Sequence, residues 1–332
     1  MISIMRSFAS LPSRWLGFHL LLVPPLLLPS AVQARSWIVS PQGGDFSTLR
    51  SALAAAQPGD RLVLQSGVYR EGPLLIRSPI VIEGEGWPVI DGEKRYEMLR
   101  IESDGVRISG IVFRNSGMSY SIDIAALKLL KGKNCQIEAN RFENNFFSIY
   151  CANAQECTVA NNEIVGHAIS EGASANGIHL WSCQRMKIHG NRVQGHRDGI
   201  YFEFVTESLV EGNQSIGNLR YGLHFMFSND DVYRTNLFER NGAGVAVMFS
   251  KRILMEGNQY RNNWGPTSYG LLLKSIDDSL IRRNLFVRNT TAIRFDEAIR
   301  NKLKILYFFT SGLLVLCSHL FLTKLLAEKK TQ

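Results

Sequence analysis

Side chains that bind soft metals recur at intervals of 22 to 26 residues in the second half of the 332-residue chain. A short apolar phrase, usually opened by glycine, returns as GIHLWS at 177, GIYFEF at 199, GLHFMF at 222, GVAVMF at 244 and GLLLKS at 270. The third and fifth residues of these phrases include imidazoles, a carboxylate and thioethers: His179, Glu203, His224, Met226 and Met248. Imidazole and thioether donors suit copper above other common metals. The phrases therefore predict a candidate copper face.

This prediction requires the phrases to be strands stacked side by side. Alternate residues of a strand point to opposite faces, so the residue after the glycine should point inward and the third and fifth outward. Stacking then produces two outer columns: His179, Tyr201, His224, Ala246 and Leu272 in one, and Trp181, Glu203, Met226, Met248 and Lys274 in the other. His224 and Met226 would lie about 6.5–7 Å apart between Cα atoms. With Met248 one turn away, they could share one ion.

Two other interpretations of this face remain open. Methionine and aromatic side chains are common at adaptable protein interfaces, so the face is also predicted to contact a partner. The residues expected there are Trp181, Tyr201, Phe227 and Lys274. The second alternative is an exported protein that binds carbohydrate or acts on it as a polysaccharide lyase or epimerase.

A lyase or epimerase needs a base, an acid and a group that neutralises the sugar carboxylate. Its candidates in this chain are His196, Arg197, Asp198, Tyr201, Glu203, Tyr221, His224, Asp230 and Asp231. Such enzymes usually carry a row of Asp, Arg and Lys on one strand face, whereas this face is apolar and aromatic. A nucleophile elbow, a phosphate loop and a paired zinc motif are also absent from the sequence. No catalytic residue is therefore assigned.

The phrases belong to a longer repeat with an asparagine at a fixed position. Its units are CQIEANRF, CTVANNEI, MKIHGNRV, SLVEGNQS, DVYRTNLF, ILMEGNQY and SLIRRNLF. Their sixth residues are Asn140, Asn162, Asn191, Asn213, Asn236, Asn258 and Asn284. Asparagine tolerates a left-handed corner and can bond to its counterpart one turn away. We predict that these residues form an internal structural ladder. Five residues later a second polar column follows: Asn145, His167, His196, Asn218, Asn241, Asn263 and Asn289.

The repeat predicts the fold. A period of 22 to 29 residues indicates a solenoid, and alternation within each unit indicates strands rather than helices. We therefore expect a right-handed parallel β-helix of the pectin-lyase type over residues 35–296. An alanine-rich helix from Leu49 to Ala56, with Ser47 as its N-cap, should cover the open N-terminal end.

Both ends of the chain carry apolar segments outside the repeat. Residues 1–34 combine basic residues, an apolar run and the small residues Val32 and Ala34, as in a cleaved secretory signal peptide. Ile305 to Thr323 is a run of 19 residues without formal charge, flanked by lysines. We expect residues 297–332 to form a C-terminal membrane-spanning helix with a basic tail, the alternative being a helix that caps the end of the solenoid. The protein should then lie in the periplasm, with this helix as an inner-membrane anchor.

The distribution of charge and the positions of the cysteines allow two further inferences. The net charge of the chain is +8, but the leader contributes +2 and the tail +4, so the repeat body is only +2 and gives no support for nucleic-acid binding. Cys135 and Cys157 occupy the same register in adjacent units. They are predicted either to form a disulfide or to remain buried thiols.

The repeat region resembles the NosD family. The resemblance rests on HRDGIYFEFVTESLVEGN at 196–213, NLRYGLHFMFSNDDVYRTNLFERNGAGVAVMFSKR at 218–252 and YGLLLKSIDDSLIRRN at 269–284, with DFSTLRSALAAAQPGDRLVLQSGVYRE near the start. It implies a periplasmic β-helix protein for the maturation of nitrous-oxide reductase. Its implied partners are the permease and ATPase of an ABC transporter, a copper-chaperone lipoprotein and the apo reductase. It implies transient copper binding at most, and no tightly bound cofactor.

Overall fold

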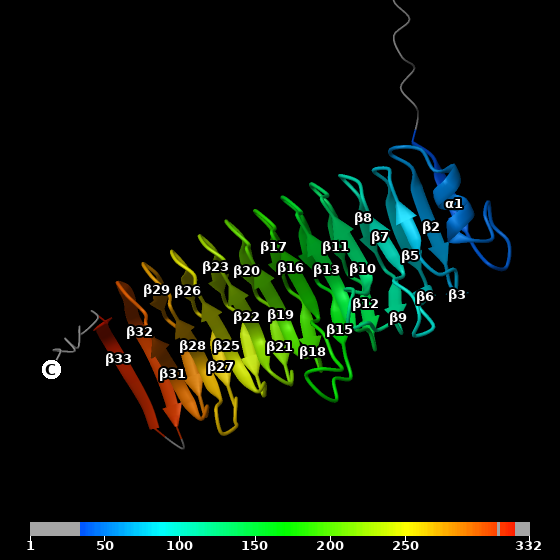
Figure 1. The fold of residues 1–332 in the computed structure, drawn as a ribbon. Helices are drawn as coiled ribbons and strands as arrows, with labels where there is room; N and C mark the ends of the chain where they lie inside the picture. Colours follow the sequence, from blue (N-terminus) through cyan, green and yellow to red (C-terminus); the bar gives the residue numbers. More distant parts are fainter. Residues whose placement is uncertain (1–33, 311–312, 323–332) are drawn as a thin grey trace, which may run out of the picture. The chain divides into compact units, whose positions relative to one another are not determined.

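Each repeat of the sequence forms one turn of a coil, in which three short strands are separated by corners (Figure 1). The computed structural model describes residues 34–310 and 313–322, and the side chains of residues 305–306, 309–310 and 313–322 are not described. All but the last residue of the predicted signal peptide (residues 1–34) lies outside the described residues, and so does the end of the predicted basic tail, residues 323–332. From Ala34 onward the described residues belong to one unit.

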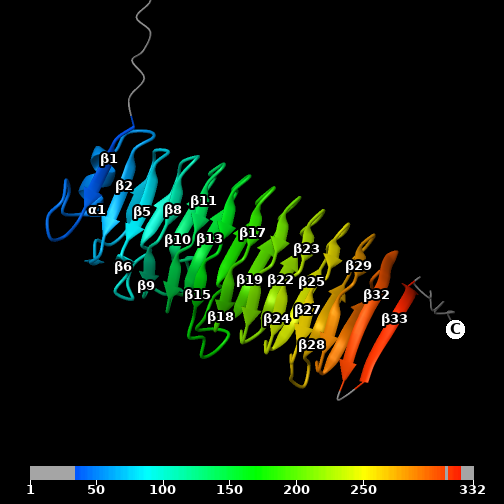
Figure 2. The same ribbon diagram turned by 180° about the vertical axis from the view of Figure 1, so that it is seen from behind.

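Equivalent strands of successive turns pair in parallel and build three sheets that surround the core (Figures 1 and 2). Sheet 1 contains β1 (Ser36–Val39), β2 (Arg61–Gln65), β5 (Val81–Glu85), β8 (Arg107–Ser109), β11 (Gln136–Glu138), β14 (Thr158–Ala160), β17 (Lys187–His189), β20 (Leu209–Glu211), β23 (Val232–Arg234), β26 (Leu254–Glu256), β29 (Leu280–Arg282) and β32 (Asn301–Thr310). Sheet 2 contains β3 (Val68–Tyr69), β6 (Val89–Asp91), β9 (Val112–Arg114), β12 (Arg141–Glu143), β15 (Glu163–Val165), β18 (Arg192–Gln194), β21 (Gln214–Ile216), β24 (Leu237–Glu239), β27 (Gln259–Arg261), β30 (Leu285–Val287) and the second half of β32.

Sheet 3 carries the phrases of the candidate copper face. Its strands are β4 (Leu74–Ile76), β7 (Leu99–Ile101), β10 (Ala125–Leu130), β13 (Phe147–Ala152), β16 (Ile178–Trp181), β19 (Asp198–Glu203), β22 (Tyr221–Met226), β25 (Ala243–Met248), β28 (Tyr269–Lys274) and β31 (Thr291–Asp296). The predicted right-handed parallel β-helix is therefore confirmed. A remaining strand, β33 (Leu313–Leu322), pairs antiparallel with β32.

The seven repeat asparagines lie in one buried column at the corner between sheets 1 and 2. From Asn162 onward, the Oδ1 of each asparagine accepts a hydrogen bond from the backbone N–H of the asparagine one turn earlier, at 2.8–3.0 Å. The same Oδ1 accepts from that residue's Nδ2, at 2.9–3.2 Å. The left-handed backbone belongs to the residue before each asparagine, such as Gly212 before Asn213, so the expected left-handed asparagines were wrong. The asparagines stabilise the corner through the hydrogen bonds of their side chains, and not by adopting the left-handed conformation themselves.

The core inside the three sheets consists of apolar and aromatic side chains that stack from turn to turn. Phe142 stacks on Phe113 at 5.0 Å between ring centroids, and Phe225 packs on Tyr233 at 3.8 Å. Helix α1 (Leu49–Ala55) covers the N-terminal end and buries Leu49 fully. Its N-cap is Thr48, whose Oγ1 accepts from the amide of Ser51. The expected Ser47 cap was wrong by one residue because the helix begins at Leu49.

The predicted C-terminal helix over Ile305 to Thr323 was also wrong, because residues 305–310 belong to strand β32 and residues 313–322 form strand β33. The last regular turn leaves the strand edges of β29 and β30 unpaired, and β32 pairs with both. Leu303 is 3% exposed, and Phe308 stacks on Phe286 at 5.3 Å, so β32 continues the core columns. Within residues 34–310 and 313–322 no helix is long and apolar enough to cross a membrane.

Candidate functional site

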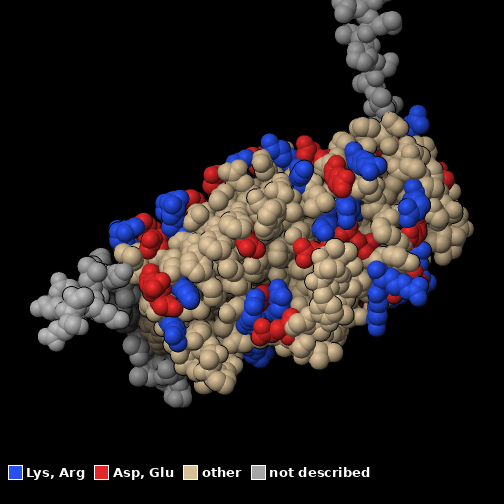
Figure 3. All heavy atoms as spheres, viewed as in Figure 1, with Lys and Arg blue, Asp and Glu red and all other residues tan. Residues whose placement is uncertain are grey.

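The structure aligns the two predicted columns on sheet 3. Tyr150, His179, Tyr201, His224, Ala246 and Leu272 are partners in register across successive strands. Trp181, Glu203, Met226, Met248 and Lys274 form the neighbouring column in the same way. The middle of this face carries few charged side chains, which gather mainly at its margins (Figure 3).

We expected the first column to be exposed to solvent, but the structure buries two of its central residues. His224 is 5% exposed and Tyr201 is 9% exposed. The ring of Tyr221 packs against His224 at 4.7 Å between centroids, and the Arg220 guanidinium lies 3.5 Å from the His224 ring. Long side chains beside the column therefore cover it, which alternation along a strand cannot predict.

His179 is held inside an aromatic stack. Its imidazole lies between Tyr150, at 4.6 Å and 5°, and Tyr201, at 4.7 Å and 21°. Its Nδ1 lies 2.9 Å from the side-chain nitrogen of Asn176. Burial, with a smaller contribution from Arg197, lowers the pKa of His179 to about 3. The ring is therefore neutral at physiological pH, and its contacts are those of a packed structural residue.

His224 differs from His179 in having a ring nitrogen that is both buried and without a hydrogen-bond partner. Its Nδ1 faces Asp198, at 3.9 Å, and Arg220, at 3.5 Å. Its Nε2 is buried and makes no hydrogen bond with the described residues. A buried polar atom without a partner is costly, so such atoms mark positions where a ligand can bind. His224 is therefore the histidine of this face that is suited to a metal.

Met226 and Met248 stand next to each other in the second column, and both are partly exposed. The Tyr201 hydroxyl lies 3.5 Å from the Met226 sulfur and donates to Glu203 Oε2 at 3.3 Å. Among the described residues no three His, Cys, Asp or Glu side chains are grouped as metal ligands. The donors that this face offers are thus an imidazole and two thioethers. We call His224, Met226 and Met248 the soft-donor cluster.

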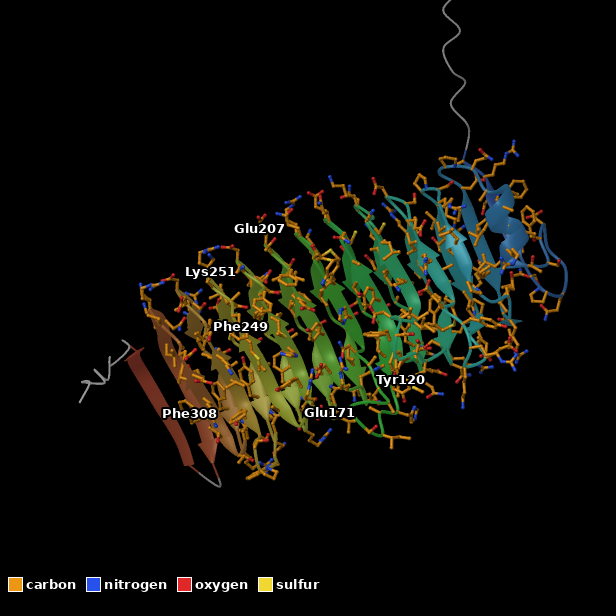
Figure 4. The ribbon with its side chains drawn as sticks, in the orientation of Figure 1. Tyr120, Glu171, Glu207, Phe249, Lys251 and Phe308 are labelled. Atoms are coloured by element: carbon orange, nitrogen blue, oxygen red, sulfur yellow. The ribbon has the colours of Figure 1, made fainter. Side chains whose placement is uncertain are left out.

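The corner that follows sheet 3 carries a feature that sequence reasoning found only in part. Phe204, Phe227 and Phe249, here called the Phe ladder, are 48%, 38% and 43% exposed. Their rings stack at 5.2 and 5.1 Å, with interplanar angles of 11° and 14°. Each has a left-handed backbone, with φ of 55°, 52° and 54°. Figure 4 labels Phe249 on the face that carries sheet 3.

A left-handed corner disfavours a bulky residue, by about 1 kcal/mol or more, and an exposed aromatic ring gains little from folding. The turns before and after the Phe ladder use Ser182 and Ser275 at the same corner. Trp181, which is 39% exposed, stands beside this edge. All three phenylalanines could have been found in the sequence, because each is the residue directly after a sheet 3 strand. Exposed apolar side chains grouped in this way are typical of an interaction surface.

The lyase candidates are engaged with each other. Asp198 is fully buried and accepts from Arg220 at 3.0 and 2.7 Å, while Arg197 Nε lies 3.6 Å away. Burial acts to raise the pKa of Asp198, but its contacts with His224 and Arg220 outweigh burial and lower it. The carboxylate therefore stays ionised and is paired with Arg220, so it is not a free group available to a substrate.

Asp230 and Asp231, also lyase candidates, lie in different surroundings. Asp230 is exposed and pairs with Arg252 through both carboxylate oxygens, at 2.5 and 2.7 Å. Asp231 is fully buried in the corner before sheet 1, where it accepts from the Ser208 amide at 2.8 Å and from the Tyr233 hydroxyl at 3.3 Å. Burial raises the pKa of Asp231 well above its ordinary value despite these bonds. The pair therefore does not form a catalytic dyad.

Replacing Asp231 by asparagine should stabilise the protein at neutral pH. In the wild type the folded state holds a proton on Asp231 that the unfolded state releases above about pH 4. The contribution of this carboxyl to stability is complete below that pH, and it is lost as the pH rises toward the raised folded pKa. Asparagine keeps the acceptor for Ser208 and does not ionise. We expect the stability difference, Asp231→Asn minus wild type, to rise by on the order of 1 kcal/mol between pH 4 and pH 7 in urea unfolding. A pH-independent difference would contradict the raised pKa.

The two cysteines in the same register are free. Cys135 and Cys157 are both buried, and the Cys157 sulfur lies 3.3 Å from the Cys135 amide nitrogen. Each thiol also contacts a carbonyl of the preceding turn, Ser103 for Cys135 and Gly132 for Cys157, at 3.3 Å. The thiols thus serve as ladder groups at this corner, as Ser208 does for Met186. Of the two alternatives, the structure has the buried thiols.

Comparisons with known proteins agree with this architecture. A family model described as "Periplasmic copper-binding protein (NosD)" matches residues 164–308. The "Probable ABC transporter binding protein NosD" of Pseudomonas aeruginosa is 28% identical over 160 residues, which cover 45% of this chain and 37% of that protein. The aligned part therefore spans little more than a third of that relative.

Solved structures show the same fold at low identity. An alginate lyase from a Paenibacillus species has a TM-score of 0.58 and 17% identity, and the alignment covers 80% of this chain and 99% of the lyase. The A-module of a mannuronan C-5 epimerase from Azotobacter vinelandii has a TM-score of 0.55 and 13% identity, with 80% of this chain and 88% of that module covered. At these identities the likeness concerns the coil alone.

Proposed function

We propose that this chain is a member of the NosD family and acts as a periplasmic accessory protein for assembling the copper centre of nitrous-oxide reductase, without catalysing a reaction itself. The observation that carries the proposal is the soft-donor cluster directly beside the exposed Phe ladder, within residues 164–308. A donor set next to a docking edge suits a protein that holds copper briefly while a partner is bound.

Copper enters this proposal as cargo, not as a resident cofactor. Thioether and imidazole donors favour Cu(I). His224 supplies a buried ring nitrogen without a partner, and Met226 and Met248 supply adjacent sulfurs. His179 and Glu203 remain outside the proposed ligand set, because the first is packed in an aromatic stack and the second accepts from Tyr201. They position Tyr201, which in turn contacts Met226.

The proposed partners are the permease and ATPase of an ABC transporter, a copper-chaperone lipoprotein and the apo reductase. The name of the Pseudomonas aeruginosa relative, an ABC transporter binding protein, supports the first of these. We assign partner docking to the Phe ladder together with Trp181, because their apolar rings are already exposed at fixed positions. Lys274 follows Met248 in the column that begins at Trp181, and it would extend this surface. A leader over residues 1–34 would deliver the protein to the periplasm.

The proposal is tested by the copper content of the reductase in a denitrifying bacterium whose gene for this protein has been deleted. Complementation with the wild type should restore copper. We expect Phe204→Asn/Phe227→Asn/Phe249→Asn to restore only a small fraction, because it removes the apolar edge while asparagine suits the left-handed corner. Ser182→Asn/Ser275→Asn, which changes the same corner in the flanking turns, should restore wild-type copper and serves as the matched control.

Two outcomes would contradict the proposal in different ways. A fully copper-loaded reductase in the deletion strain would overturn the role in assembly. Wild-type copper with the triple phenylalanine variant would overturn docking through the Phe ladder. Unsaturated or epimerised products from uronate polymers, made by the purified protein, would instead establish the enzymatic alternative.

A further inference from the structure

The second polar column is interrupted at His167. At Ser116, His196, Asn218 and Asn241 the backbone amide donates to an asparagine Oδ1 one turn later, at 2.9–3.0 Å. Asn145 makes no such bond to His167, because the His167 side chain turns to the surface. The ladder thus has a gap between the turns of Asn145 and His196, at the edge where two long loops leave the coil.

A cavity of about 290 Å³ occupies this region. Its walls come from the turn after β6, which carries Lys94, the loop after β9, the corners at Asn145 and His196, and the loop of residues 166–177. Figure 4 labels one residue of each loop, Tyr120 and Glu171, at the lower edge of the face. This volume lies at the small end of the range for ligand pockets, so the cavity suits a compact molecule.

The polar lining of the cavity includes one lysine and one serine hydroxyl that has no hydrogen-bond partner. Lys94 and His167 are exposed at its wall, and Lys94 makes no ion pair with a described carboxylate. No Asp or Glu lines it. Ser174 is 7% exposed, and its hydroxyl is buried without a hydrogen-bond partner. An unpartnered buried hydroxyl that lines the same cavity as an unpaired lysine favours an anionic group.

The remaining lining combines apolar side chains with the polar residues Ser116, Asn144 and Asn145. Phe146, Met118 and the alanines of the 166–177 loop line the cavity. His196 forms its floor and adds no charge, because burial lowers the pKa of this histidine to about 4. A bare phosphate or sulfate would leave these apolar walls unused. A molecule with one anionic end and one apolar end would use both.

We propose that this cavity binds a small organic carboxylate. Lys94 pairs with the carboxylate at the rim, Ser174 donates its hydroxyl proton to it, and Phe146 and Met118 pack on the apolar body. The site is separate from the soft-donor cluster and from the Phe ladder. It therefore adds a ligand-binding activity to the proposed function and does not depend on it.

The test is calorimetric titration of the full-length protein with benzoate, benzamide and inorganic phosphate. Benzamide matches benzoate in shape but lacks its charge, and phosphate lacks the apolar body. We expect saturable binding of benzoate, with benzamide and phosphate at least tenfold weaker. Lys94→Gln should weaken benzoate binding at least tenfold and Ser174→Ala several-fold. Lys187→Gln, an exposed lysine on β17, is the matched control and should change nothing.

Any of three results would overturn the proposal: no saturable benzoate binding, equal binding of benzoate and benzamide, or unchanged affinity in Lys94→Gln. Both lining variants should still fold, because Lys94 is exposed and Ser174→Ala removes only a hydroxyl without a partner. The assay contains no copper and no reductase. Its failure would therefore leave the copper-assembly proposal intact, and loss of that proposal would leave this site intact.

Discussion

Replacing His224, Met226 and Met248 together by alanine should weaken Cu(I) binding by roughly 100-fold or more. Changes to groups that merely orient metal ligands already cost about 10–100-fold in affinity, and this variant removes the donor atoms themselves. His224 contributes its buried Nε2, and the two sulfurs come from neighbouring strands. Competition titration with a chromophoric Cu(I) chelator measures the difference. Equal affinities of variant and wild type would eliminate the site.

Two controls separate metal binding from general damage to sheet 3. Met118→Ala removes an exposed methionine from the loop after β9, away from the cluster, and should leave the Cu(I) affinity unchanged. His179→Phe keeps an aromatic ring between Tyr150 and Tyr201 and should change the affinity by a few-fold at most, because the His179 ring is held in the stack. A large loss in His179→Phe would instead make His179 a ligand.

The repeat spacing was sufficient to predict which residues share a wall. A parallel coil adds one turn per repeat, so residues at equal phase become neighbours about 4.8 Å apart whatever their side chains are. That rule placed His224 beside Tyr201 and Met226 beside Met248, as their registers show. It needed no knowledge of packing, because backbone pairing alone fixes the register.

Burial of the first column and the role of the corners could not be predicted in the same way. Whether His224 is open to solvent depends on Arg220 and Tyr221, whose side chains cross from the start of its own strand. The exposure of Phe204 and Phe249 depends on a left-handed corner that turns the ring outward. The strands after Asp296 follow from unpaired edges at the end of the coil, whereas an apolar run alone is equally compatible with a helix.

Replacing Asn213 by alanine should destabilise the coil by roughly 3–5 kcal/mol, because buried polar groups that lose their partners cost about 1–3 kcal/mol each. Asn213 is 1% exposed. Its Oδ1 accepts from the Asn191 amide at 3.0 Å, and its Nδ2 donates to the Ile188 carbonyl at 2.8 Å. Both groups would remain buried without these bonds. Urea unfolding followed by circular dichroism measures the loss.

The matched control is Gln214→Ala, one residue further along the same turn. Gln214 is exposed and accepts from Arg192 at 2.7 Å, so its loss should change stability by no more than about 0.5 kcal/mol. The left-handed residue here is Gly212, not Asn213, so alanine at 213 brings no backbone strain. The difference between the two variants therefore isolates the ladder bonds. If Asn213→Ala destabilised the protein as little as Gln214→Ala, the asparagine ladder would not stabilise the coil. The stacking that brings His224 and Met248 together would then depend on the apolar core alone.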